Sequence, residues 1–80
     1  MQNSKQSKCR WDAGQVKIFV RDATARWGAG WENLSSEGQR GVILGQAMRV
    51  MLVQAEENTY TSDDMRRLVN AMLDAAGVQP

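Results

Sequence analysis

The sequence of 80 residues contains no histidine, a single cysteine, a single proline and few aromatic residues. The absence of histidine excludes His-based acid–base catalysis, the Ser-His-Asp and Cys-His arrangements, and every zinc site with an imidazole ligand. The one thiol, Cys9, can neither close an internal disulfide nor supply the several thiolates of a structural zinc or iron–sulfur site. We therefore expect a protein that is not an enzyme and that uses no metal or other cofactor.

The sequence also lacks any apolar run long enough for the core of a signal peptide or for a membrane span. This absence and the single cysteine favour a cytoplasmic protein with no membrane partner. Nothing in the sequence indicates a small-molecule substrate. Cys9 lies between Lys8 and Arg10, whose charges favour its thiolate modestly, but an incidental cysteine is the simpler interpretation.

What is present is the composition of a folded domain, because 42% of the residues are hydrophobic and 24% are charged. A chain of this length has room for one hydrophobic core. Residues 1–10 are polar and carry no periodic apolar position, so we interpret them as a flexible basic arm that precedes a single domain at 11–80.

The first predicted helix covers about residues 12–27. Asp12 and Gln15 have the spacing of a capping box, and Trp11 and Val16 have the spacing of a hydrophobic staple. Gly28 is the natural end of this helix. The apolar residues expected to face the core are Val16, Phe19, Val20, Ala23 and Trp27.

The second predicted helix covers about residues 36–57, capped by Ser35 or Ser36, after a loop over 28–34 that packs onto the core. Its apolar residues form a belt that covers more than half of the helical circumference, which a central or a shared helix requires. We place Val42 and Val53 outside this belt, beside Gln46 and Arg49. The residues assigned to the belt are Ile43, Leu44, Ala47, Met48, Val50, Met51, Leu52 and Ala55.

The third predicted helix covers about residues 62–76, capped by Thr61 or Ser62, and Gly77 followed by Val78 predicts a Schellman-type end. Its apolar residues recur on one face, which is typical of a surface helix over a core. Three helices with short connections predict an all-α protein, a small three-helix bundle. The residues expected to face inward are Met65, Leu68, Val69, Met72, Leu73 and Ala76.

The breadth of the apolar belt leads to the main functional hypothesis, a non-enzymatic adaptor, inhibitor or regulatory protein that binds another protein or a second copy of itself. The alternative is that the middle helix needs a broad apolar stripe simply because it packs against two neighbours. Trp11, Trp27 and Trp31 are likewise either core residues or an aromatic binding surface. The candidate partner-binding residues are Ile18, Val42, Gln46, Arg49, Val53 and Trp31.

The charge distribution supports an alternative of another class, a small nucleic-acid-binding regulator. Residues 1–31 contain six Lys and Arg against two acidic residues, whereas residues 32–80 contain four against seven. A basic arm and one helix face could follow phosphates, although a solvated charged face explains the same residues. The predicted helices do not have the spacing of a helix-turn-helix, so we expect no base reading. The candidate nucleic-acid-binding residues are Lys5, Lys8, Arg10, Lys17 and Arg21.

Overall fold

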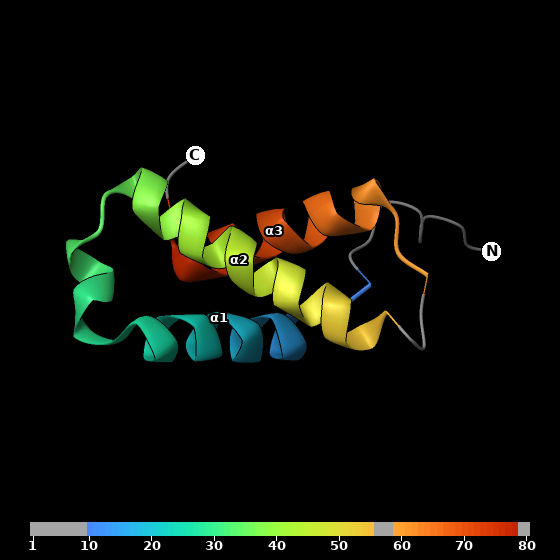
Figure 1. Ribbon diagram of the computed structural model, residues 1–80, viewed down its shortest axis with the longest axis horizontal. Coiled ribbons are helices and arrows are strands. Elements are labelled where there is room, and N and C mark those ends of the chain that lie inside the picture. Colours follow the sequence, from blue (N-terminus) through green and yellow to red (C-terminus); the bar gives the residue numbers. More distant parts are fainter. Residues whose placement is uncertain (1–9, 56–58, 79–80) are drawn as a thin grey trace.

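The computed structural model describes residues 10–55 and 59–78 and confirms the predicted all-α, three-helix architecture. The α-helices run alternately in opposite directions, and α2 crosses in front of the C-terminal half of α3 in Figure 1. Each of the three packs against the other two. The elements in chain order are α1 (Ala13–Trp27), the 3₁₀ helix η2 (Gly28–Asn33), α2 (Ser36–Gln54) and α3 (Ser62–Ala76).

The starts of the helices follow from side-chain caps. Asp12 accepts a hydrogen bond from the backbone N–H of Gln15, whose side chain accepts one from the Asp12 N–H in return, so the predicted capping box is confirmed. Thr61 and Asp64 form a second such box at the start of α3. Of the two candidate caps for α2, Ser35 is the one that accepts from Gly38.

The ends of the helices are set by glycine and by changes in helix type. Gly77 has φ of 73°, and the N–H of Val78 donates to the Leu73 carbonyl at 3.0 Å, which confirms the Schellman-type end. Gly28 ends α1 with φ of 84°, a conformation that side chains disfavour. The segment predicted as a loop at 28–34 is instead largely the short 3₁₀ helix η2. The described α2 ends at Gln54, short of the predicted end at about residue 57.

The core lies between the three helices, and each helix contributes to it. The most deeply buried large side chains are Ile43 of α2 and Leu68 and Met72 of α3. Half-buried apolar residues, including Phe19 and Val20 of α1, pack around them. Because α2 packs on both α1 and α3, the side of α2 that points away from them is left without cover.

Candidate functional site

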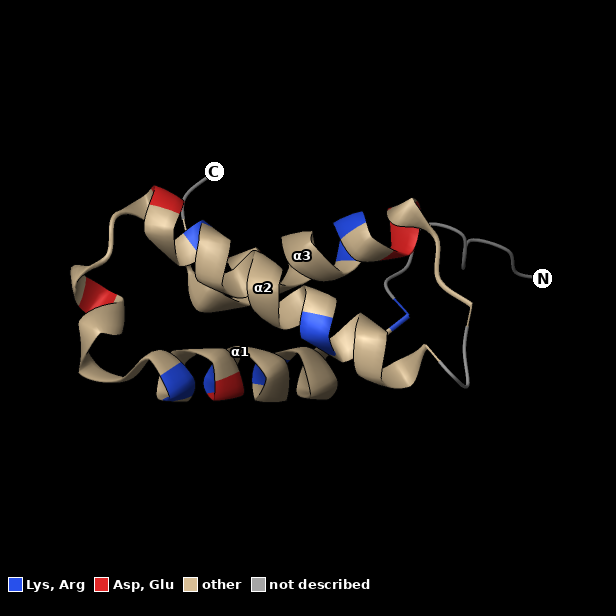
Figure 2. Ribbon diagram, viewed as in Figure 1, with Lys and Arg blue, Asp and Glu red and all other residues tan. Residues whose placement is uncertain are grey.

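The uncovered side of α2 carries a row of apolar residues that we call the outward stripe: Gly41, Gly45, Met48 and Leu52. Their spacing of four, three and four residues keeps them on one helix face. Met48 and Leu52 are 48% and 72% exposed, and a Cβ atom added at either glycine would meet nothing within 4 Å. In Figure 2 most of the visible ribbon of α2 is uncharged. The N-terminal half of the stripe therefore has no side chains, the C-terminal half has two large apolar side chains, and no residue of the stripe is charged.

A shallow groove between α1 and α2 borders the stripe and has a volume of about 220 Å³. Both glycines of the stripe lie on its α2 side, and Ala23 and Trp27 lie on its α1 side. Arg26 and Arg49 add two guanidinium groups to its lining. The groove thus extends the apolar surface from α2 towards the end of α1 and gives that border a positive charge.

Four of the six predicted partner-binding residues gather along this border. Val42, Gln46 and Arg49 line the groove, and Val53 lies with Gln46 and Arg49 in the adjoining hollow. Ile18 is exposed on α1, on the face opposite the buried Val16, and lies outside this group. Trp31 is half-buried in η2, where its carbonyl accepts a hydrogen bond from Gln39 at 2.9 Å.

The predicted orientation of α2 is rotated relative to the structure. Gln46, expected outside the apolar belt, is only 8% exposed, and its side-chain oxygen accepts a hydrogen bond from Arg26 at 3.3 Å. Leu44, Met48 and Leu52, expected inside the belt, are exposed. The reason is that α1 covers the side of α2 that carries Gln46, so the buried arc turns towards it and the opposite apolar residues face outward.

The stripe therefore contains residues that the sequence interpretation missed as a site. The glycines were the signal, because two glycines one turn apart inside an otherwise apolar helix weaken that helix unless something approaches its backbone closely. The three tryptophans also separate in the structure. Trp11 is buried, but Trp27, which was predicted to face the core, is the last residue of α1, lines the groove and is 51% exposed.

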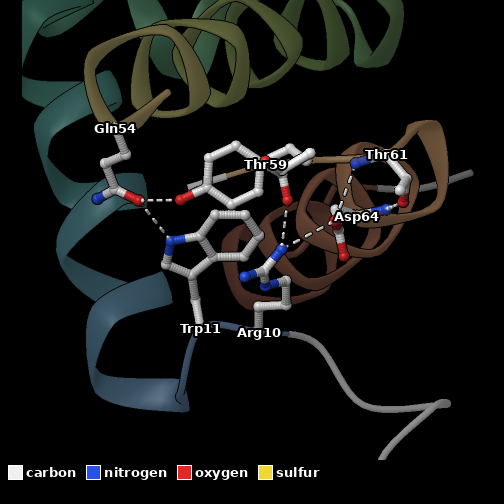
Figure 3. Close-up of polar contacts among 7 residues, drawn as sticks. Arg10, Trp11, Gln54, Thr59, Thr61 and Asp64 are labelled. Carbon is white, nitrogen blue, oxygen red and sulfur yellow. Dashed lines mark hydrogen bonds and ion pairs between the residues drawn. The ribbon is translucent and has the colours of Figure 1, made fainter. Parts of the chain in front are cut away.

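At the far end of α2 lies a polar cluster that we call the N-terminal clamp: Arg10, Trp11, Gln54, Tyr60 and Asp64 (Figure 3). The Gln54 side-chain oxygen accepts hydrogen bonds from the indole N–H of Trp11 at 3.2 Å and from the Tyr60 hydroxyl at 2.8 Å. The Trp11 and Tyr60 rings stack with centroids 5.3 Å apart. The clamp ties the start of α1, the end of α2 and the start of α3 together.

Arg10 and Asp64 complete the clamp. The Arg10 guanidinium lies over the Tyr60 ring and donates to the Thr59 carbonyl at 2.8 Å and to the Asp64 carboxylate at 3.2 Å. The pKa of Asp64 lies below its ordinary value, chiefly because the Thr61 backbone N–H donates to its carboxylate, with a further contribution from Arg10 that acts against partial burial. Asp64 therefore favours the ionised form that the clamp uses.

Of the predicted nucleic-acid-binding residues that the structure describes, Lys17 and Arg21 are exposed one turn apart on α1, and Arg10 lies apart from them. Arg10 is engaged in the clamp, and Lys17 lies in a hollow between α1 and α3 that also contains Asp74. Arg21 is exposed on α1. Lys5 and Lys8, with Cys9 and most of the predicted arm, lie outside the described residues, so the nucleic-acid hypothesis stays a prediction.

No protein-family model, curated protein or solved structure matches the chain. Within residues 10–55 and 59–78, no three cysteine or acidic side chains are grouped closely enough to hold a metal ion. None of the described helices is both long and apolar enough to cross a membrane. The candidate site is thus defined by its surface alone, the outward stripe of α2 and the groove beside it.

Proposed function

We propose that the chain is a non-enzymatic protein–protein interaction module that binds its partner through the outward stripe of α2. The observation that carries this proposal is the exposure of Met48 and Leu52 in line with two helical glycines that have open space before them. Isolated apolar residues are common on protein surfaces, but an aligned and uncharged row of them is typical of a helix-packing surface.

The glycines strengthen the proposal because they have no function in the isolated chain. Each glycine in a helix interior is less favourable than alanine by about 1 kcal/mol. A Cβ at Gly41 or Gly45 would meet no other group, so packing within the chain does not require glycine there. Close approach of a partner's side chains to the backbone of α2 does require it. The absence of histidine from the sequence agrees with a binding function and not a catalytic one.

The experiment is an affinity capture from a lysate of the source cell with wild-type chain, Leu52→Glu and Ile18→Glu. Both substitutions place a carboxylate at an exposed apolar position, but only Leu52 belongs to the stripe. We expect Leu52→Glu to lose the captured protein and Ile18→Glu to keep it, while circular dichroism shows both variants helical. Capture that survives Leu52→Glu would contradict the proposal. Material that disappears after nuclease treatment would support the nucleic-acid alternative instead.

A further inference from the structure

We propose that the partner of the outward stripe is a second copy of this chain, and that the two α2 helices pack antiparallel across a two-fold axis that crosses the stripe midway between Gly45 and Met48. This inference rests on the proposed function and names the occupant of the same surface. It follows from the order in which small and large residues occur along the stripe.

The spacing of the stripe is that of a helix-pair seam. Residues four, three and four positions apart repeat on one side of a helix and meet the same side of a neighbouring helix. Gly41 and Gly45 form the N-terminal half of the stripe, and Met48 and Leu52 form the C-terminal half. The stripe therefore presents two holes followed by two knobs.

An antiparallel pair matches these halves to each other. With the axis midway between Gly45 and Met48, Leu52 of the second copy lies against Gly41, and Met48 of the second copy lies against Gly45. The open space before both glycines accepts these side chains without displacing any group of the chain. A parallel pair would place glycine against glycine and leucine against leucine, so one half of the stripe would favour close approach of the two helices and the other half would hold them apart. Antiparallel packing also sets the two helix dipoles in opposite directions.

The size of the stripe predicts a weak interface. With 19 residues, α2 is about 28 Å long, and a helix is about 10 Å wide. This strip is well below the roughly 800 Å² per partner of a standard stable interface. The exposed Leu44 at its border and Trp27 across the groove enlarge it moderately. A second copy supplies a strip of matching size and shape, and we expect a dimer that dissociates on dilution into the micromolar range.

The first test is sedimentation equilibrium of the wild-type chain, Leu52→Glu and Ile18→Glu from micromolar to millimolar concentration. We expect wild-type chain and Ile18→Glu to show the same concentration-dependent dimer. Leu52→Glu should weaken the dimer by at least about tenfold, because each copy would bury an unpaired carboxylate against the partner's Gly41. A wild-type chain that remains monomeric at millimolar concentration would overturn the inference.

The second test fixes the geometry by disulfide formation in a Cys9→Ser background. A differently sized tag on each variant distinguishes mixed dimers from dimers of one variant. A mixture of Gly41→Cys and Leu52→Cys should form the mixed disulfide, because these positions face each other. Leu52→Cys alone should not, because its two copies lie about 16 Å apart along the helix axis. The reverse pattern, with Leu52→Cys alone linking efficiently, would indicate a parallel pair and overturn the proposed geometry.

The two failures are distinguishable. If the chain is monomeric but Leu52→Glu still abolishes capture of a cellular protein, the second copy is excluded and the interaction function of the stripe stands. If the dimer forms equally well in Leu52→Glu, the stripe is not its interface and the inference is overturned, whereas the capture experiment still decides the proposed function.

Discussion

The N-terminal clamp and the outward stripe lie on the same three-helix bundle. They differ in how many interactions their side chains make with the rest of the chain. In the clamp, Trp11, Tyr60 and Gln54 each have a hydrogen-bond partner within the chain, and Arg10 is paired with Asp64. In the stripe, two apolar side chains face solvent and two glycines face open space.

This difference separates residues that hold the fold together from residues that the fold leaves available. Removing one partner of a buried aromatic or hydrogen-bonded group lowers the free energy of unfolding of the protein. Changing an exposed apolar residue or a helical glycine alters the free energy of unfolding little, and replacing a glycine can even stabilise the helix. The clamp is therefore expected to govern the free energy of unfolding, and the stripe is expected to govern association.

The largest expected effect is that of Trp11→Ala. This change removes a buried indole, its stacking on Tyr60 and its hydrogen bond to Gln54, so we expect a loss of about 3–5 kcal/mol in the free energy of unfolding. Leu52→Ala removes an exposed side chain and should change the stability of the monomer by less than about 0.5 kcal/mol. Urea unfolding at low protein concentration measures both values. Comparable losses in the two variants would mean that the stripe is part of the folding core.

The second prediction concerns the opposite effects of Gly41→Ala and Gly45→Ala on folding and on association. Because nothing lies near either Cβ position in the monomer, each change should raise the free energy of unfolding by about 0.5–1 kcal/mol. In the antiparallel dimer the same methyl groups occupy the holes for Leu52 and Met48 of the second copy, so the double variant should dimerise about tenfold more weakly. Urea unfolding and sedimentation equilibrium measure the two effects. A double variant that is more stable and dimerises as well as wild-type chain would show that Gly41 and Gly45 do not accept Leu52 and Met48 of the second copy.

The local features of the fold were predictable from the sequence because they depend on neighbouring residues. The capping box at Asp12 and the glycine end at Gly77 follow from residue types at fixed spacing, and both are confirmed. The extent of the second helix was predicted less well. Its apolar pattern continues to Ala55, but the helix ends at Gln54, whose side chain accepts a hydrogen bond from the Tyr60 hydroxyl.

The candidate site was only partly predictable, because helical periodicity shows that a side of α2 is apolar but not which neighbour covers it. Gln46 is buried by α1, and Leu52 is exposed, although a helical wheel of α2 alone places them the other way round. The turn of α2 about its own axis is set by packing between residues far apart in the sequence.

The smallest expected effect is a change in acid stability at the clamp. Because the pKa of Asp64 is lowered in the folded state, its ionised form stabilises the fold above the unfolded pKa, near the ordinary value of 3.8, and this contribution is lost as the pH falls through the lower folded value. Asp64→Asn should lose less than about 1 kcal/mol at neutral pH, because the pair is partly solvated, and should flatten the decline in stability on acidification. Arg10→Met should flatten it less, because the Thr61 N–H is the larger cause of the shift. Urea midpoints at neutral and acidic pH test this order, and equal flattening in both variants would show that the ion pair dominates.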